Sequence, residues 1–362
     1  MKVLLLCGGE GTRLRPFTHS IPKQLLPVVN KPILHHILEW VAAKTPLREV
    51  VLLTGENQEI FRQAVGDGSR WGLQISYVCQ PRPLGLAHAV LTAETALGKE
   101  AFLMYLGDNL LEESVGEYLC VFEEKHLDSL LLLRKVPDPE NYGIAEIAGD
   151  RVLRVVEKPE KPPGNLALSG LYLFSPAIFQ SIRNISPSAR GELEITDAIQ
   201  NLLDRRKKVE YRLLTGWWLD TGSPDALLDA NRYLLGKFTP AVLGRVINSR
   251  VNGCLYLERE SSIENSQING PVYIGAGCRI KDSTIGPWVT IGDGGTVTGS
   301  ALKNSILFSG AQVENFALHQ SIIGRRALLT GRHRPDQAQG AALSPQPFSR
   351  LLVGDDGVVS GL

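Results

Sequence analysis

The sequence predicts a two-part chain, in which an α/β domain with a mostly parallel sheet is followed by a parallel β-helix. Up to about residue 235, short apolar runs alternate with stretches of helix length. Continuous apolar strands separated by helices are typical of a parallel sheet covered on both faces. After about residue 245, aliphatic residues recur every five or six positions, which is typical of β-helix coils. We therefore expect domains at 1–240 and 241–330, and an irregular tail at 331–362.

The first domain is expected to contain seven strands with amphipathic helices between them. The apolar runs predict strands at 2–6, 49–54, 74–78, 101–106, 129–134, 170–174 and 210–214. Helical spacing of apolar residues predicts helices at 32–43, 57–65, 85–97 and 193–205. Ligands of open parallel sheets bind at the carboxyl ends of the strands. Two turns that follow such ends are therefore of interest, Gly8-Gly9 and Gly107-Asp108-Asn109.

The second part carries a hexapeptide period from Val246 to Ile323, with Ile-Gly pairs such as Ile274-Gly275 and Ile291-Gly292. Because each coil of the prism has three flat faces, roughly five rungs are expected. An antiparallel sandwich is the alternative, whereas helix is disfavoured by the β-branched residues and glycines. The composition of 331–349 indicates a linker, and a short strand pair is expected around Gly354-Asp355-Asp356-Gly357.

Composition argues for a cytoplasmic protein without a nucleic-acid or membrane partner. Lys plus Arg and Asp plus Glu are both 38, so the formal net charge is zero and any polyanion must be bound locally. The five cysteines lack C-x-x-C spacing, which indicates reduced thiols rather than disulfides or a zinc site. We expect no signal peptide, and no apolar run approaches the ~18 residues that cross a bilayer.

The stretch Gly8-Gly9-Glu10-Gly11-Thr12-Arg13 suits a phosphate-binding loop after the first strand. Glycines let backbone N–H groups approach phosphate oxygens. The dinucleotide fingerprint would need a third glycine where Leu14 stands, and no Gly-Lys-Ser/Thr closes the loop as in a Walker motif. Arg13 and Lys23 flank a non-helical stretch, and two cations beside such a loop would neutralise a triphosphate. Either cation alone could be an ordinary surface residue.

Two aspartates are candidate metal ligands. Asp108 follows a predicted strand, and Asp220 lies in Trp217-Trp218-Leu219-Asp220-Thr221-Gly222. Mg²⁺ prefers hard oxygen ligands and commonly combines one or two carboxylates with phosphate oxygens. Each aspartate alone could simply cap a turn, but as a pair they suit a Mg²⁺ site.

Together, these motifs closely resemble those of the sugar-1-phosphate nucleotidylyltransferases. Within that family they resemble the long-form glucose-1-phosphate thymidylyltransferases. The resemblance extends over nearly the whole chain, because the long form also ends in a β-helix, which is left-handed. It is carried by ordered motifs: 8–16, Lys23-Gln24-Leu25-Leu26-Pro27-Val28, Asn30-Lys31-Pro32, Gln80-Pro81 with Gly85-Leu86-Ala87, Gly107-Asp108-Asn109, Tyr142-Gly143, Glu157-Lys158-Pro159, 187–197 and Gly216-Trp217-Trp218.

The resemblance implies a Rossmann-like nucleotidyltransferase sheet and a role for each matching residue. Gly8, Gly9, Gly11 and Thr12 would wrap a nucleoside triphosphate, with Arg13 on the pyrophosphate and Lys23 near the α-phosphate. Gln24, Gln80 and Gly85 would read a pyrimidine base, and Asp108 and Asp220 would hold Mg²⁺. The sugar site would be formed by the remaining residues, with Lys158 on the sugar phosphate and Trp218 closing the pocket: Tyr142, Gly143, Glu157, Lys158, Gly170 and Trp218.

The implied reaction is Mg²⁺-dependent transfer of a nucleotide from dTTP to glucose 1-phosphate by direct in-line attack, which gives dTDP-glucose and pyrophosphate. The implied partners are these two substrates, and a homo-oligomer is expected from the β-helix. Three alternatives remain: a relative that uses UTP or another sugar 1-phosphate, an acyltransferase in the β-helix, whose repeats offer only His319 as a base, and a non-catalytic assembly or sensing relative. Cys7 is interpreted as a packing residue.

Overall fold

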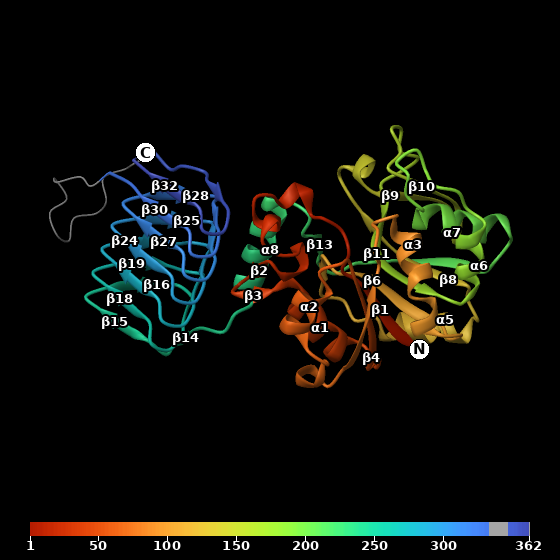
Figure 1. Cartoon of the computed structure of the whole chain (residues 1–362), viewed down its shortest axis with the longest axis horizontal. Helices are drawn as coiled ribbons and strands as arrows, with labels where there is room; N and C mark the ends of the chain where they lie inside the picture. Colours follow the sequence, from red (N-terminus) through yellow and green to blue (C-terminus); the bar gives the residue numbers. More distant parts are fainter. Residues whose placement is uncertain (333–346, 362) are drawn as a thin grey trace. The chain divides into compact units, whose positions relative to one another are not determined.

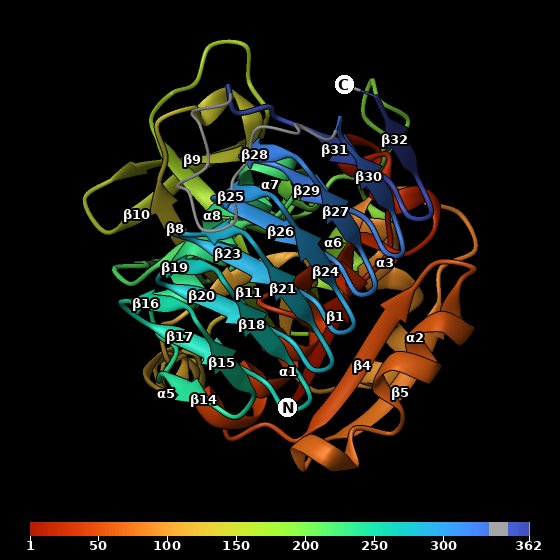
Figure 2. The ribbon, with the colours of Figure 1, turned by 90° about the vertical axis from the view of Figure 1, so that its left-hand side faces the viewer.

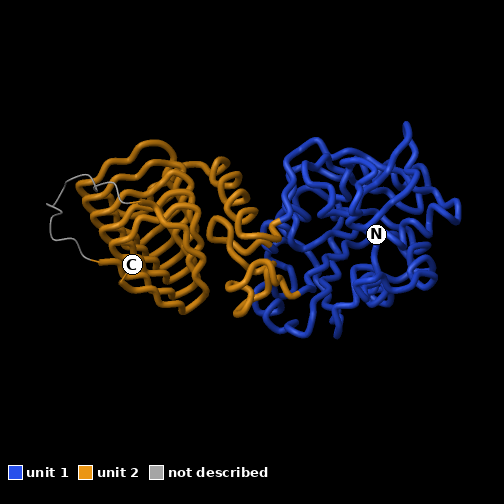
Figure 3. Tube along the Cα trace, turned by 90° about the horizontal axis from the view of Figure 1, so that it is seen from above, with its two compact units in different colours: residues 1–9, 34–220 blue, residues 10–33, 221–362 orange. Residues whose placement is uncertain are grey.

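A computed structural model describes residues 1–332 and 347–361 and divides the chain into two compact units (Figure 3). The first unit contains Met1–Gly9 and Leu34–Asp220, and the second contains Glu10–Ile33 and Thr221–Leu362. This division differs from the boundaries expected from the sequence. Glu10–Ile33, which the motif analysis assigned to the first domain, groups instead with the C-terminal part of the chain.

The first unit is built on a nine-stranded sheet whose main path is β10-β9-β11-β6-β1-β4-β5, with β8 paired to β11 and β12 paired to β8 (Figure 1). β1, β4, β5 and β6 are parallel, β12 is parallel to β8, and β11 runs antiparallel to β6 and β8. The predicted strands are confirmed as β1 (Lys2–Leu6), β4 (Glu49–Thr54), β5 (Gln74–Cys79), β6 (Phe102–Leu106), β8 (Ser129–Lys135), β11 (Leu166–Phe174) and β12 (Val209–Leu213).

Two antiparallel pairs complete the strands of the first unit. β9 (Gly143–Ala148) and β10 (Arg151–Glu157) form a hairpin at one end of the sheet. β7 (Asn109–Leu111) and β13 (Trp218–Asp220) form a separate two-stranded sheet. Neither pair was expected from the sequence, and both carry candidate site residues.

Helices bury the apolar strands of the first unit, as the alternating pattern predicts. Side chains of the strands, such as Leu4 and Met104, share one core with helical side chains such as Val90 and Ile199, all at most 1% exposed. The predicted helix at 85–97 is divided at Ala93 into α3 and α4. The helices are α1 (Ile33–Lys44), α2 (Gln58–Val65), α3 (Leu86–Thr92), α4 (Glu94–Leu97), α5 (Gly116–Glu124), α6 (Ala177–Arg183) and α7 (Ile195–Asp204). In the part of the chain that the structure describes, no helix is long and apolar enough to cross a bilayer.

The second unit contains the predicted parallel β-helix, with three stacked sheets consistent with a left-handed coil (Figure 2). Inward-facing aliphatics such as Ile280 and Val297 stack in register and are at most 1% exposed. The first sheet contains β14 (Ala241–Val242), β17 (Leu255–Leu257), β20 (Val272–Ile274), β23 (Val289–Ile291), β26 (Ser305–Leu307), β29 (Ile322–Ile323) and β31 (Leu352–Val353). The second contains β15 (Arg245–Ile247), β18 (Ser262–Glu264), β21 (Arg279–Lys281), β24 (Thr296–Thr298), β27 (Gln312–Glu314), β30 (Leu328–Thr330) and β32 (Val358–Ser360). The third contains β16 (Arg250–Asn252), β19 (Gln267–Asn269), β22 (Thr284–Ile285), β25 (Ala301–Lys303) and β28 (Ala317–His319).

The stack is longer than the five rungs expected, since two of its sheets contain seven strands among the described residues. The C-terminal residues account for part of the difference. β31 pairs in parallel with β29, and β32 pairs in parallel with β30, rather than with each other as a hairpin. Val353 and Val359 pack against the β-helix core, so burial of these side chains extends the coil. Strands are therefore present on both sides of Gly354-Asp355-Asp356-Gly357, as expected, but they extend the β-helix instead of pairing with each other. The linker expected at 331–349 lies largely outside the described residues.

Residues 10–33 and helix α8 (Pro224–Leu235) complete the second unit. Residues 10–33 form three single-turn 3₁₀ helices, at Thr12–Leu14, Phe17–His19 and Lys23–Leu25, and a hairpin of β2 (Pro27–Val28) and β3 (Lys31–Pro32). α8 begins with Pro224 at its first turn, and the Ser223 hydroxyl accepts a hydrogen bond from the Ala226 N–H at 3.2 Å. α8 packs against both β2 and β26.

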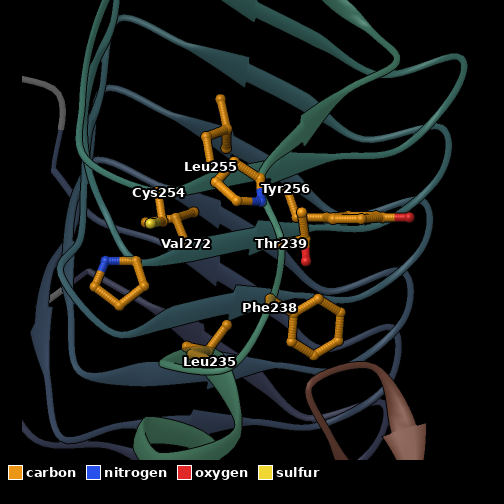
Figure 4. Close-up of a pocket in the computed structure, with 9 residues that line it drawn as sticks. Leu235, Phe238, Thr239, Cys254, Leu255, Tyr256 and Val272 are labelled. Carbon is orange, nitrogen blue, oxygen red and sulfur yellow. The ribbon is translucent and has the colours of Figure 1, made fainter.

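Aromatic packing joins the end of α8 to the first coils of the β-helix. The ring of Phe238 lies 5.6 Å from that of Tyr256 and 5.5 Å from that of Tyr273, both edge to face. A small apolar pocket beside these rings is lined by Leu235, Cys254 and their neighbours (Figure 4). This cluster fixes the point at which the helix passes into the β-helix.

Candidate active site

The carboxyl ends of the parallel strands meet at one edge of the first unit's sheet. Backbone hydrogen bonds continue the pairing past the strand ends. The Gly107 N–H donates to the Leu6 carbonyl at 2.9 Å, and the Gln80 N–H donates to the Thr54 carbonyl at 2.8 Å. Ligands of open α/β sheets bind at this edge. It collects four of the predicted site residues: Gly8, Gly9, Gln80 and Asp108.

Gln80 is held in a fixed orientation beside the glycine loop. Its side chain is 7% exposed, and its Nε2 donates to the Gly85 carbonyl at 3.3 Å and lies 2.8 Å from Nδ1 of His88. A Cβ atom on Gly8 would lie 3.4 Å from Oε1 of Gln80. Gly85 has φ +102°, and a Cβ there would collide with the Leu193 carbonyl. The structure thus brings Gly8, Gln80 and Gly85 together, and only glycine fits at 85.

The two candidate metal ligands lie at the same end of a strand pair, Asp220 in β13 and Asp108 in the turn just before β7. β7 and β13 are antiparallel, and Asp220 is directly opposite Asn109, the residue after Asp108. Tyr105, which is fully buried, donates its hydroxyl to the Asn109 carbonyl at 2.8 Å and so fixes the turn that carries Asp108. Burial raises the pKa of Tyr105 well above its ordinary value, and the negative charge of Asp108 raises it further. The pairing therefore holds the two carboxylates at neighbouring backbone positions.

This pair of carboxylates fits a hard divalent cation. Both aspartates are partly buried. Across the described residues, no group of three or more His, Cys, Asp or Glu side chains is placed to hold a metal ion by itself. Mg²⁺ characteristically binds one or two carboxylates and takes its remaining ligands from phosphate oxygens and water. Asp108 and Asp220 therefore suit a cation that arrives with a phosphorylated substrate.

The β9–β10 hairpin brings four predicted sugar-site residues together. Glu157 pairs with Gly143 across the hairpin, and the Lys158 N–H donates to the Tyr142 carbonyl at 3.0 Å. A Cβ on Gly143 would lie 2.8 Å from Cγ2 of Thr196 and 3.2 Å from Oε2 of Glu157. Because a larger residue would push the Glu157 carboxylate aside, glycine at 143 preserves its position.

Trp218 and Gly170 belong to the same neighbourhood. The indole N–H of Trp218 donates to the Ser169 carbonyl at 2.8 Å, and the rings of Trp218 and Tyr142 lie 6.0 Å apart. The Asn109 side-chain amide donates to the same Ser169 carbonyl at 2.6 Å. Gly170 has φ +82°, and a Cβ there would collide with that amide. One carbonyl therefore links the tryptophan of the sugar site to the strand that follows Asp108.

The remaining predicted residues belong to the second unit. Gly11, with φ +62°, accepts a hydrogen bond from the Thr18 hydroxyl at 2.8 Å, and a Cβ on Gly11 would lie 3.2 Å from Cβ of Lys23. Thr12 and Arg13 are exposed in the following 3₁₀ turn. Gln24 is 1% exposed. The structure thus brings Gly11 and Lys23 together, whereas the burial of Gln24 does not favour direct contact with a base.

Comparison with known proteins identifies the family. Residues 2–237 match the nucleotidyl transferase family model. The chain is 40% identical over 358 residues, 98% of both chains, to a glucose-1-phosphate thymidylyltransferase of Streptomyces griseus. This chain belongs to the sugar-1-phosphate nucleotidyltransferase family. It is also 35% identical to a UTP–glucose-1-phosphate uridylyltransferase of Haloferax volcanii, over 67% of this chain and 99% of the relative. A structure assigned as a Bacillus anthracis glucose-1-phosphate thymidylyltransferase, solved with sucrose, matches with a TM-score of 0.60 and 32% identity, and covers 67% of this chain and 97% of its own.

Within this nucleotidyltransferase, Glu157 is the candidate sugar ligand with the most perturbed surroundings. Its side chain is 22% exposed, and Oε1 lies 3.3 Å from Arg190 and 3.9 Å from Nζ of Lys158. Burial raises the pKa of Glu157 above its ordinary value, and the charge of Glu194 raises it further. The cations of Lys158 and Arg190 act in the opposite direction without cancelling this effect. The site therefore holds a carboxylate whose charge is only partly compensated.

Because the pKa of Glu157 is raised, its charged carboxylate should destabilise the folded protein at neutral pH. The variant Glu157→Gln, which removes the charge, tests this expectation. A group whose folded-state pKa is raised contributes stability that is fully present below its ordinary pKa, 4.5 for this glutamate, and that is lost as the pH rises through the folded-state value. We expect Glu157→Gln to raise Tm at pH 7, and the gain to shrink as the pH falls toward 4.5. Thermal unfolding between pH 4.5 and 8 measures this difference.

A matched control for this variant lies on the same hairpin. Glu146 pairs with Arg154 at 3.0 Å on an exposed surface, so Glu146→Gln should change Tm by no more than about 1 °C. If Glu157→Gln lowers Tm at neutral pH, the carboxylate stabilises the fold and the interpretation is wrong.

Sequence reasoning assigned no role to His88, Asn109 or Arg190, all of which support predicted residues. Arg190 contacts both Glu157 at 3.3 Å and Glu194 at 2.8 Å. The i,i+4 spacing of Arg190 and Glu194 was visible in the sequence, but the contact with Glu157 depends on chain segments far apart. His88 and Asn109 act through Gln80 and the Ser169 carbonyl, which only the folded chain brings to them.

Proposed function

We propose that the chain transfers a thymidylyl group from dTTP to glucose 1-phosphate, giving dTDP-glucose and pyrophosphate. The observation that carries this proposal is the 40% identity over 98% of both chains to the Streptomyces griseus thymidylyltransferase, since a match of that length includes the β-helix as well as the sheet. The clustering of the sugar-site residues around the β9–β10 hairpin supports it independently.

The chemistry follows from the charges of the substrates. A phosphate oxygen of glucose 1-phosphate attacks the α-phosphorus in line, a new P–O bond forms, and the bond to the β-phosphate breaks as pyrophosphate leaves. The nucleophile is already an anion, so no general base and no covalent enzyme intermediate are needed. The work of the protein is positioning and charge neutralisation. We assign Arg13 to the leaving pyrophosphate, Lys23 to the α-phosphate and Lys158 to the sugar phosphate.

Mg²⁺ is the proposed cofactor, and Asp108 and Asp220 are the residues that would hold it. The pairing of β7 and β13, which places Asp220 opposite the residue after Asp108, and the partial burial of both aspartates support this assignment. When bound, the ion neutralises phosphate charge as the α-phosphorus is attacked. The contribution of the chain is to fix the two carboxylates through strand pairing and through the bond from Tyr105 to Asn109.

The base and the sugar would be recognised by the two groups of residues in the first unit. We assign Gln80 to amide hydrogen bonding with a pyrimidine and Gly85 to a backbone contact, because these residues are locked against each other and against Gly8. Gly9, Gly11 and Thr12 would provide the rest of the phosphate loop. We also propose that Gln24 lies near the base. Because its side chain is buried, it would act by supporting neighbouring residues rather than by direct contact with the base. Tyr142, Gly143, Glu157, Gly170 and Trp218 would form the sugar site.

The nearest alternative is a relative that uses UTP, which the 35% identity to the Haloferax volcanii uridylyltransferase favours. A single methyl group on the pyrimidine gives weak discrimination. A panel of pyrophosphate release that crosses dTTP, UTP, CTP, ATP and GTP with the 1-phosphates of glucose, galactose, mannose and N-acetylglucosamine tests both choices. We expect the highest kcat/KM for dTTP with glucose 1-phosphate. A preference for UTP would overturn the base assignment. No pyrophosphate release with any pair of substrates would overturn the proposed function.

We also propose that the protein is a cytoplasmic homo-oligomer. β14, β15 and β16 are the end strands of the three β-helix sheets, and exposed strand ends favour association with another chain. Several large apolar side chains are exposed there: Val242, Leu243, Val246, Ile247 and Val251. Sedimentation at micromolar protein should give a mass above that of one chain, and a monomer mass would contradict this proposal.

A further inference from the structure

One face of the β-helix carries outward-pointing side chains that are buried and mostly apolar. Four residues that are paired in register on β20, β23, β26 and β29 point away from the core yet are 8%, 1%, 1% and 0% exposed: Tyr273, Thr290, Ile306 and Ile322. On β21 and β27 the outward positions are exposed polar residues. We call the first set the covered face. Its partners in the second unit include α8, where Asn231 accepts a hydrogen bond from Thr290, and residues 10–33, where Asn30 is hydrogen-bonded to Tyr273. Residues 10–33 contain Arg13 and Lys23.

The first attachment of residues 10–33 is at the β2–β3 turn. Val29 and Asn30 both have positive φ, 47° and 58°, a conformation that a β-branched valine rarely adopts without external support. The Val29 N–H donates to Oδ1 of Asn231 at 3.3 Å, and the Thr290 hydroxyl donates to the same oxygen at 2.7 Å. The Asn30 amide donates to Oδ1 of Asp293 at 2.8 Å. Residues of α8 and the β-helix therefore hold this strained turn.

The second attachment lies nearer to Arg13. Phe17 and Phe308 are fully buried, and their rings meet edge to face with centroids 5.7 Å apart. The Ser20 hydroxyl donates to Oδ2 of Asp355 at 2.7 Å. Asp355 lies in the Gly354-Asp355-Asp356-Gly357 turn, and its other oxygen accepts from the Arg325 N–H at 2.7 Å. The turn between the last two strands thus contacts the segment that carries the predicted catalytic cations.

We propose that the covered face and the Gly354–Gly357 turn position Arg13 and Lys23 for catalysis. The inference rests on the proposed function, in which these cations neutralise the triphosphate. Lys23 lies between the two attachments, and Arg13 is four residues before Phe17. Short segments anchored at buried rings and charged hydrogen bonds have few conformations, and catalysis by positioning is sensitive to small displacements. Asn30, Asp293 and Asp355 are therefore positioning residues, and the β-helix contributes to turnover as well as to assembly.

The test weakens one attachment without disturbing the cations. Asn30→Gly removes the amide that reaches Asp293 and keeps the left-handed backbone, since glycine adopts positive φ readily. Asp293→Ala removes the acceptor, together with its bond from the Ala276 N–H. We expect each variant to lower kcat about tenfold with KM for the sugar phosphate within about twofold, and the double variant to lose no more than either single one. Asp293→Asn, which keeps an acceptor oxygen, should restore most of kcat.

A matched pair elsewhere on the β-helix provides the control. Asn265 also has positive φ, 48°, and its amide donates to Oδ1 of Asp282 at 3.2 Å on an exposed turn. Asn265→Gly and Asp282→Ala remove the same kinds of side chain without altering the bonds to residues 10–33. Because Asp282 itself has positive φ, 49°, its alanine variant is the more demanding control for stability. Both should keep kcat within about twofold of the wild type. Comparing the two pairs of variants separates the specific effect on kcat from any loss of stability that such glycine and alanine substitutions share.

Hydrogen exchange provides a readout that does not require activity. Amides in 10–33 should exchange about tenfold faster in Asn30→Gly and Asp293→Ala, and at the wild-type rate in the controls. An active wild type with unchanged kcat in both Asn30→Gly and Asp293→Ala overturns the inference, whatever the exchange shows. A wild type that releases no pyrophosphate overturns the proposed function instead, and unchanged exchange in 10–33 would then overturn the inference separately.

Discussion

Replacing Asp220 with asparagine is expected to lower kcat for pyrophosphate release by about 100-fold or more. Asparagine keeps the size of the side chain and the β7–β13 pairing, so the fold should be unchanged, but it removes one of the two anionic oxygens proposed to hold Mg²⁺. Metal stabilisation of phosphoryl charge contributes several kcal/mol, and each 1.36 kcal/mol corresponds to a factor of ten in rate. Steady-state kinetics over a Mg²⁺ titration measure the effect, and the Mg²⁺ concentration for half-maximal rate should rise.

Lys158→Ala provides the contrast to Asp220→Asn, because its proposed role is to bind the sugar phosphate. We expect about a tenfold rise in KM for glucose 1-phosphate with a smaller change in kcat, since the lost contact acts on the ground state as well as on the transition state. Normal turnover and normal Mg²⁺ dependence in Asp220→Asn would disprove the metal assignment while leaving the family assignment intact.

Arg13→Ala is expected to lower kcat by about 100-fold, because the leaving pyrophosphate loses its proposed counter-charge. The Arg13 side chain is exposed, so the free energy of unfolding should change by no more than about 0.5 kcal/mol. Arg13→Lys should recover only part of the rate, since an ammonium group cannot reproduce the planar two-donor contact of a guanidinium with phosphate. Single-turnover measurements with saturating triphosphate separate this loss from weaker substrate binding.

Arg15 is the matched control for Arg13. It is two residues away, also exposed, and its guanidinium lies 3.7 Å from the Glu10 carboxylate. A surface pair of this kind contributes little to stability. Arg15→Ala should therefore retain a kcat within about threefold of the wild type. Equal losses in the two variants would mean that the net positive charge of the segment matters, rather than the placement of Arg13.

The strands of the sheet and the coils of the β-helix could be predicted because burial imposes a pattern of apolar residues that is visible in the local sequence. A strand covered on both faces, such as β1, is a continuous apolar run, and a β-helix repeats one inward aliphatic at a fixed spacing. The pattern of the β9–β10 hairpin is less clear, because Arg151 and Arg154 interrupt the apolar run of β10 and Leu153 is apolar although 50% exposed. β31 and β32 were expected as a strand pair, but their place in the β-helix was not, because the stretch before them interrupts the period of the repeat.

The grouping of residues 10–33 with the β-helix could not be derived from chain order. The motif suggested one continuous phosphate loop, but the contacts of Phe17 with Phe308 and of Asn30 with Asp293 join positions that are hundreds of residues apart. One signal was present in the sequence. Tyr273, Ile306 and Ile322 occupy outward positions where polar residues are usual, and such side chains need a partner.

In the candidate site too, the sequence suggested residues but not the tertiary contacts that explain them. The glycines at 85 and 170 were noted from the resemblance, but what makes them necessary is the backbone of Leu193 and the amide of Asn109, which only the tertiary structure brings close. The two aspartates were chosen by chemistry, and their adjacency follows from the β7–β13 pairing, which periodicity did not predict.

The bond between Ser20 and Asp355 joins residues that are 335 positions apart, and this separation has a consequence for synthesis. At ~5–20 residues per second, Asp355 is added roughly 15–70 seconds after Ser20. For roughly the last 7–27 seconds of that interval, after Gly222 has been added, the nascent chain contains every signature motif but lacks the turn that contacts Ser20. A ribosome that stops early would release a product with an intact motif and an unsecured catalytic segment. If the Gly354–Gly357 turn positions the catalytic cations as proposed, full turnover requires a chain that extends through this turn.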